Sequence, residues 1–208
     1  MSGLIGKKVG MTSVYDDSGN HLPVTVIEIE PNVITQIFTE EKDGYNGVQL
    51  AAFDKKEKST SKALIGHFDK AGTSPKKVVK EIRDYIPEGL EVGDLLTVDD
   101  VFQIDTGVNV VGVSKGKGFA GVVKRHIFRG VGGQTHGQHN RERAPGSIGQ
   151  ASDPSRVFKG VKMGGQLGNS RTLIKRLRIV QILSDSNLLL VKGSVPGAKG
   201  SYVEVYNS

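Results

Sequence analysis

The chain has 208 residues and a mass of 22.3 kDa, which suffices for one well-packed core and excludes more than about two domains. It contains no cysteine, so disulfide frameworks, thiolate metal sites and redox chemistry through sulfur are excluded. The net charge is +6 at neutral pH, a modest value that by itself excludes no class of partner. No apolar run has the length of a signal peptide or a membrane span, so we expect a soluble cytoplasmic protein without membrane contact.

Short apolar runs separated by turn residues predict a mainly β protein with minor α-helix. The runs expected to form strands are 8–15, 22–29, 33–38, 48–53, 78–82, 95–98, 108–113, 173–183, 188–192 and 202–206. Turns are expected at Asp17-Ser18-Gly19 and at Asp185-Ser186-Asn187, and a short helix at 61–70. Many short strands bounded by Gly, Asp, Asn or Pro favour a barrel or a sandwich over a doubly wound parallel sheet.

The positive charge is concentrated in residues 114–178. This stretch holds 14 Lys and Arg against only Glu142 and Asp153, whereas the rest of the chain holds 14 basic and 20 acidic residues. Such asymmetry favours a polyanionic partner that touches one part of the chain. The alternative is a basic face that contacts only solvent.

Within the basic stretch, residues 128–170 are too poor in apolar side chains to form a core of their own. Only 10 of these 43 residues are hydrophobic and ten are glycine. Ordering each residue costs about 1–2 kcal/mol of backbone entropy, so the segment is either a flexible linker or an arm ordered by a partner. Too few residues follow for a second domain, which favours the arm.

We therefore predict a single body with one long insertion. Residues 1–113 are expected to form the first part of a β-barrel body, 114–170 a largely irregular, basic, glycine-rich extension that penetrates RNA, and 171–208 the final strands of the body. As a hairpin, the extension reaches on the order of 70 Å at full stretch. Glycine permits close approach of backbones and Lys and Arg neutralise phosphates, a combination suited to passage between RNA helices.

One glycine motif has two readings. The run from Gly116 to Gly121 fits the dinucleotide-binding pattern G-x-G-x-x-G and follows the expected strand at 108–113, with Glu142 at about the spacing of the ribose-binding acid. Glu142, however, lies between two arginines in an expected loop. The other reading is a backbone phosphate site on RNA, surrounded by the basic residues Lys115, Lys117, Lys124 and Arg125.

Other potential sites are incomplete. His136 and His139 lack a cysteine or nearby carboxylate partner, so RNA contact or simple solvent exposure is favoured over a metal. Gly-Gly-Gln occurs at 132–134 and again at 164–166; this tripeptide is the signature of peptide-chain release factors, but in so glycine-rich a segment chance explains it better. No nucleophilic triad is indicated, and we expect neither a cofactor, a metal, a small-molecule substrate nor enzymatic activity.

Five separated blocks carry a family resemblance. The first is the spaced set Phe102, Asn109, Gly112, Ser114, Gly116, Lys117, Gly118, Gly121 and Arg125. The others lie at 6–12, 145–149, 156–160 and 187–197 and read GKKVGMT, PGSIG, RVFKG and NLLLVKG followed by VPG. Together they span nearly the whole chain and closely resemble the large-subunit ribosomal protein L-three family of bacterial type.

The resemblance implies a barrel of the kind seen in translation proteins, with an extension that runs through large-subunit (23S) rRNA toward the peptidyl transferase centre. It also implies a structural role in the large subunit, neighbouring ribosomal proteins as partners, and a part in early assembly. The RNA-binding residues expected from charge and resemblance are Lys115, Lys117, Lys124, Arg125, Arg129, His136, His139, Arg141, Arg143, Arg156, Lys159, Lys162 and Arg171. The residues expected near the tip of the extension are Gly146, Ser147, Ile148, Gly149 and Gln150.

Two positions vary within the family that the chain resembles. In some bacterial members a glutamine at the place of Gln150 is methylated on its side-chain amide, whereas many members have alanine there. A glutamine methyltransferase is therefore an implied partner where the organism has one. At Ile127 other members often carry glycine or asparagine. A translation-factor-like protein that only visits the ribosome, and a nucleotide-dependent enzyme, stay open as alternatives.

Overall fold

The computed structural model of the protein describes residues 2–16, 18–83 and 89–208. Contacts divide the chain into two compact units, the first formed by Met1–Ser114 with Arg171–Ser208 and the second by Lys115–Ser170. We call the first unit the body and the second the extension. Asp17, in one of the expected turns, lies outside the described residues.

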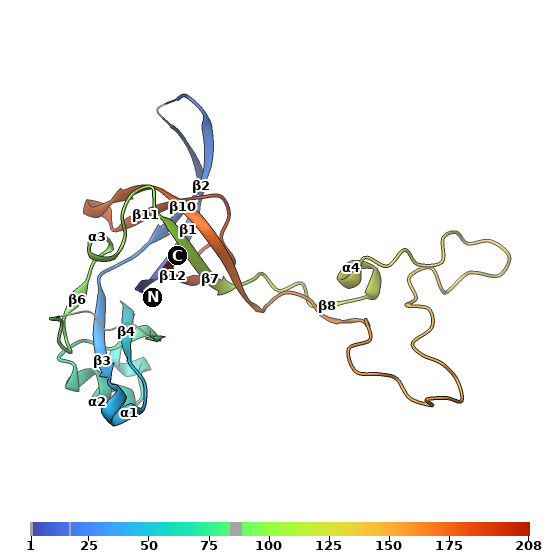
Figure 1. The fold of residues 1–208 in the computed structure, drawn as a ribbon, viewed down its shortest axis with the longest axis horizontal. Helices are drawn as coiled ribbons and strands as arrows, with labels where there is room; N and C mark the ends of the chain where they lie inside the picture. The colour runs from blue at the N-terminus through green and yellow to red at the C-terminus, as the bar shows by residue number, and fades with distance from the viewer. Residues whose placement is uncertain (1, 17, 84–88) are drawn as a thin grey trace. The chain divides into compact units, whose positions relative to one another are not determined.

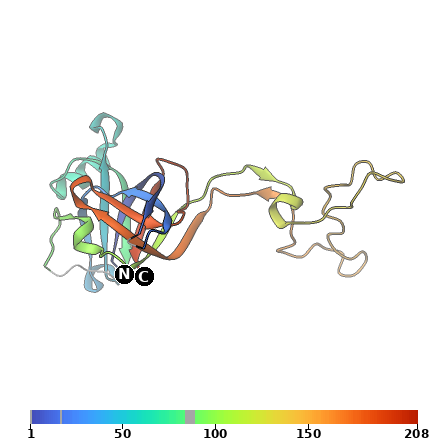
Figure 2. The same cartoon turned by 90° about the horizontal axis from the view of Figure 1, so that it is seen from above.

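The body contains a closed barrel of six strands in the order β1-β12-β7-β10-β11-β2 (Figures 1 and 2). All neighbouring strands pair antiparallel. The barrel strands are β1 (Gly3–Tyr15), β2 (His21–Glu28), β7 (Gly107–Val113), β10 (Arg171–Leu183), β11 (Leu188–Lys192) and β12 (Tyr202–Asn207). The prediction of a mainly β fold with a barrel and minor helix is confirmed.

Alternation of apolar and polar residues explains why these segments form strands around one core. On β12, Val203 and Val205 are buried whereas their neighbours are partly exposed, and Val108 and Val110 repeat the pattern on β7. Successive side chains of a strand point to opposite faces, so one face of each strand fills the barrel. Burial of each such side chain contributes about 1.5–3 kcal/mol relative to exposure.

A second sheet, of four antiparallel strands in the order β5-β4-β3-β6, belongs to the body as well. Its strands are β3 (Asn32–Phe38), β4 (Gly47–Asp54), β5 (Lys76–Arg83) and β6 (Leu95–Leu96). The assignment of residues 1–113 to a barrel alone was therefore too simple, because only three strands of that range, β1, β2 and β7, belong to it. Ile34, Val48 and Leu50 of this sheet belong to the same hydrophobic cluster as the residues inside the barrel, so the two sheets share a core.

Short helices connect the strands. They are α1 (Glu40–Asp43), α2 (Lys62–Lys70), α3 (Val98–Val101) and α4 (Val122–His126), with single 3-10 turns at Glu57–Ser59 and Ser184–Ser186. The expected helix at 61–70 is confirmed by α2. The expected strand at 95–98 was wrong at its end: the Thr97 hydroxyl donates to Asp100 Oδ2 at 2.6 Å and the Thr97 N–H donates to the same oxygen at 2.8 Å. This cap starts α3 directly after β6.

One buried asparagine links the second sheet to the barrel. Asn32, at the start of β3, is 0% exposed. Its Oδ1 accepts from the Ile5 N–H at 2.9 Å, and its Nδ2 donates to the carbonyls of Ile5 at 3.2 Å and Glu30 at 2.8 Å. The Asn32 amide thereby satisfies the backbone N–H and the carbonyl of Ile5 in β1.

A half-buried carboxylate makes a second link. Glu204 on β12 lies 3.0 Å from Lys80 Nζ of β5 and 3.2 Å from a guanidinium nitrogen of Arg171, and it accepts from the Tyr206 hydroxyl at 3.0 Å. Burial acts to raise the pKa of Glu204, but the hydrogen bonds from Lys80 and its other two partners outweigh it and hold the pKa below its usual value. Burial, with this carboxylate next to it, raises the pKa of Tyr206 above its usual range.

Candidate nucleic-acid interface

The extension begins and ends in a small folded element. Strand β8 (Phe119–Ala120) pairs antiparallel with β9 (Gly165–Gln166), and α4 follows β8 (Figures 1 and 2). The Lys117 N–H donates to the Leu167 carbonyl at 2.8 Å, and the Leu167 N–H donates to the Gly118 carbonyl at 3.0 Å. The two limbs are therefore joined by backbone hydrogen bonds within the chain.

The end of α4 is fixed to the returning limb. Arg125 Nη1 donates to the Met163 carbonyl at 2.9 Å, and His126 Nε2 lies 3.0 Å from the same oxygen. Because a carbonyl only accepts, the Nε2 of His126 carries the proton. Ile127 follows in the left-handed conformation, with φ of 62°. Glycine and asparagine adopt this conformation at less cost than the β-branched isoleucine.

Between Phe128 and Lys162 the described chain has neither helix nor strand. All thirteen residues predicted to bind RNA are exposed; twelve lie in the extension, and Arg171 begins β10 of the body. The predicted tip residues, Gly146 to Gln150, are exposed as well, and the Ser147 hydroxyl donates to the Gly149 carbonyl at 2.9 Å. The extension thus presents its cations to solvent rather than to a core.

Three of the predicted RNA-binding cations also have partners within the protein. Arg171 is paired with Glu204 at 3.2 Å, Arg125 donates to Met163, and the Arg156 guanidinium lies 5.0 Å from the centre of the Phe158 ring. A guanidinium has five N–H donors, so one internal contact fixes its direction and leaves other donors for a phosphate.

The dinucleotide reading of Gly116 to Gly121 is wrong. That fingerprint requires a parallel βαβ unit. In the described residues every strand pair is antiparallel, and the preceding strand, β7, pairs with β10 and β12. The helix after the glycines, α4, has only five residues. Gly116 and Gly118 instead lie in the irregular segment between β7 and β8, and Gly121 is the N-cap of α4.

Neither a metal centre nor a membrane helix is found among the described residues. No three His, Asp or Glu side chains lie close enough together there to hold a metal ion. No helix in the described ranges combines the length and apolar character that a bilayer crossing needs.

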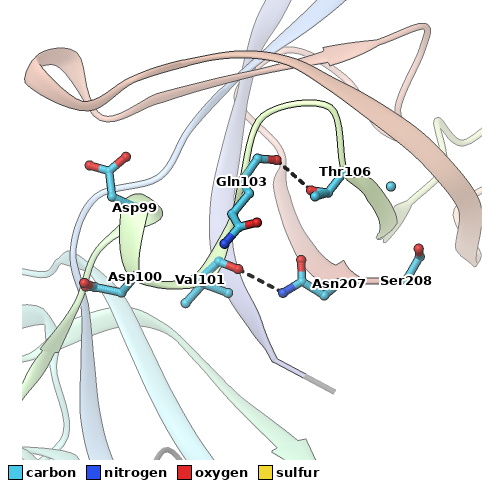
Figure 3. Close-up of a pocket in the computed structure, with 8 residues that line it drawn as sticks. Asp99, Asp100, Val101, Gln103, Thr106, Asn207 and Ser208 are labelled. Carbon is cyan, nitrogen blue, oxygen red and sulfur yellow. Dashed lines mark hydrogen bonds between the residues drawn. The ribbon is translucent and has the colours of Figure 1, made fainter.

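A cavity of about 380 Å³ lies beside α3 in the body (Figure 3). Its two carboxylates have structural partners: Asp99 accepts from the Ser184 hydroxyl at 2.9 Å, and Asp100 caps α3. Asn207 Nδ2 donates to the Val101 carbonyl at 2.9 Å across its wall (Figure 3). The polar groups of this cavity stabilise the end of the barrel, and no catalytic arrangement results.

A larger groove, of about 920 Å³, lies between β5 and the barrel strands β7, β10 and β12. Lys175 and Arg176 line it at a bulge of β10, where the register with β7 shifts between Ile174 and Leu177. Arg176 has φ of 55°, and its backbone N–H donates to Asn109 Oδ1 at 3.0 Å. Both cations belong to the basic stretch 114–178 but were not among the predicted RNA-binding residues. Their position inside the apolar run 173–183, where charged residues are unexpected on a core-facing strand, was the signal in the sequence that could have pointed to them.

Comparison with known proteins agrees with the resemblance in sequence blocks. The profile of the family described as Ribosomal protein L3 matches residues 72–186. The large ribosomal subunit protein uL3 of Salinibacter ruber (strain DSM 13855 / M31) is 58% identical over 205 residues, which cover 99% of this chain and 98% of the relative. Similarity therefore includes the body and the extension alike. The chain belongs to the ribosomal protein L3 family.

Proposed function

We propose that the protein is a non-enzymatic structural constituent of the large ribosomal subunit in the cytoplasm and that it binds 23S rRNA through its extension. The observation that carries this proposal is that all thirteen predicted RNA-binding residues are exposed and that twelve of them lie on the extension, which contributes no residue to either hydrophobic core cluster. Membership of the family supports the ribosomal role, since the relative of 58% identity is a large ribosomal subunit protein. The partners are rRNA and neighbouring large-subunit proteins.

The mechanism is neutralisation of phosphates. The extension carries ten Lys and Arg against two acidic residues, Glu142 and Asp153. Such a chain placed between RNA segments reduces their mutual repulsion, while the glycines permit close backbone approach. We infer that the extension reaches toward the peptidyl transferase centre, that the body anchors it, and that binding supports early assembly of the subunit.

The stretch that gains its shape from RNA is 128–162. Composition predicted this for all of 128–170, but Gly165 and Gln166 pair with β8 and the Met163 carbonyl accepts a hydrogen bond from Arg125 of α4. Residues 128–162 lack such elements and expose most of their side chains. Contacts with rRNA offset the entropy of ordering them.

Binding of the purified protein to a large-subunit rRNA fragment is expected to weaken steeply as salt rises. The logarithm of the association constant should fall with the logarithm of salt concentration by about 0.7–0.9 per phosphate contact. Arg141→Gln with Arg143→Gln should reduce this slope by about two contacts. Lys56→Gln with Lys58→Gln, the same charge change on the body, should leave it unchanged. A flat salt response of the wild type would contradict the proposal.

We propose Gln150 as a site of side-chain methylation. The side chain is exposed in the loop that follows Gly149, so an enzyme has access to its amide in the free protein. The mass of the protein purified from its own organism is expected to exceed the sequence mass by one methylene, located to Gln150 by fragmentation. An unmodified peptide spanning Gln150 would show that no methyltransferase acts on this chain.

A further inference from the structure

The two most exposed large apolar side chains of the described residues lie within nine positions of each other in the extension. Ile127 is 89% exposed and Phe119 is 83% exposed, ahead of Tyr15 of the body at 74%. The apolar residues between them behave differently: Ala120 and Val122 are each 3% exposed. The folded element therefore buries the apolar side chains that it uses for packing and holds Phe119 in solvent.

The Phe119 ring has a defined place. One edge of the ring lies beside Gly164 of the returning limb, where an added Cβ would be 3.3 Å from two ring carbons, Cε1 and Cζ. The backbone of Phe119 is fixed by pairing with Gln166 and by the adjoining hydrogen bond of Gly118. A ring positioned in this way loses little conformational entropy on binding.

The segment that carries the ring is cationic. Residues 115–127 include the four exposed basic residues Lys115, Lys117, Lys124 and Arg125, and neither Asp nor Glu. Single-stranded nucleic acids are bound by this combination, in which an aromatic face stacks on a base and cations hold the adjoining phosphates. Charge complementarity therefore favours a polyanion over an apolar protein surface.

We propose that Phe119 is a stacking platform for one unpaired base of the rRNA, with the lysines of the same element on the adjoining phosphates. This inference rests on the proposed function and deepens it. A paired base within a helix has both faces covered by its neighbours, so the base is in a loop, a bulge or at a helix end. Stacking supplies affinity without base identity, because every base presents a π-face.

Substitutions at Phe119 in the full chain separate stacking from charge and from simple apolar contact. Phe119→Ala and Phe119→Leu are expected to bind a large-subunit rRNA fragment about 5- to 100-fold more weakly, with the salt slope unchanged. Phe119→Tyr, which keeps an aromatic ring, should bind with wild-type affinity. Lys117→Gln with Lys124→Gln should instead lower the salt slope. Wild-type affinity of Phe119→Leu would overturn the stacking proposal, and a wild type without salt-dependent binding would overturn the proposed function with it.

A fluorescence measurement gives an independent readout. The chain has no tryptophan, so Phe119→Trp installs a single indole on the platform. Its emission is expected to be quenched when the rRNA fragment binds. Tyr15→Trp, at another strongly exposed aromatic position, serves as the matched control and should keep its emission. Unquenched emission of bound Phe119→Trp, or equal quenching at both positions, would overturn the proposal.

Discussion

Replacement of residues 114–170 by Asn-Gly is expected to leave the body folded and to abolish tight rRNA binding. The register of the barrel makes the deletion possible, because Val113 at the end of β7 pairs directly with Arg171 at the start of β10. Asn-Gly is the preferred two-residue connection between antiparallel strands. The deleted segment contributes no residue to either sheet of the body.

The loss of affinity follows from charge. The deletion removes 10 of the 28 Lys and Arg but only 2 of the 22 acidic residues. Loss of six or more phosphate contacts is expected to lower the salt slope of binding by about 4 or more, at roughly 0.7–0.9 per contact, and to remove most of the affinity near physiological salt. Urea unfolding measures the stability of the body. Sedimentation in a high-salt gradient measures whether the variant stays bound to the large subunit.

A full-length variant separates charge from chain length. In it the five exposed cations Arg129, Arg141, Arg143, Lys159 and Lys162 are changed to glutamine. It should lose most of the affinity that the deletion loses. Retained affinity in both variants would mean that the body, with its basic groove at Lys175 and Arg176, is the main rRNA-binding surface. An unfolded deletion variant would mean that the boundary between body and extension is misplaced.

Asn32→Ala is expected to destabilise the body by about 2–4 kcal/mol. The substitution removes three hydrogen bonds and leaves the N–H and carbonyl of Ile5 buried without their partner. An unsatisfied buried polar group costs about 1–3 kcal/mol, and alanine adds nothing that compensates. The free energy of unfolding, measured by urea titration monitored by circular dichroism, checks this value.

Asn46 is the matched control for Asn32. Its Oδ1 accepts from the Glu40 N–H at 3.0 Å, but the residue is exposed and water can replace the contact. Asn46→Ala should therefore lower the free energy of unfolding by less than about 1 kcal/mol. An equal loss of free energy of unfolding in the two variants would show that the hydrogen bonds of the Asn32 amide do not hold β3 against β1.

Strand positions in the body were predicted from the sequence because period-two alternation is a local signal. The runs at 108–113 and 202–206 match β7 and β12 almost residue for residue. The division into a barrel and a second sheet was not predicted, since strands of both sheets alternate in the same way and only their pairing differs. The short helix α3 was missed because four residues are too few for a helical period, although the Thr97 and Asp100 pair signalled its start.

The predicted RNA-binding residues were found exposed because they are charged residues in a segment without a core. The structural partners of Arg125 and Arg171 were not predictable, since Met163 and Glu204 lie 38 and 33 positions away in sequence. The same is true of the setting of Phe119, which depends on the backbone at Gly164. Contacts between distant parts of the chain decide these features.

The amino-acid sequence by itself determined the mainly β character, the concentration of cations in one insertion, and the poverty of that insertion in apolar side chains, because composition and local periodicity are properties of the chain alone. Only the tertiary structure decided which strands close the barrel, that the base of the extension is folded through β8, β9 and α4, and that Phe119 is held exposed there. These depend on pairing between segments far apart in the sequence, where side-chain pattern permits several partners and three-dimensional packing selects one.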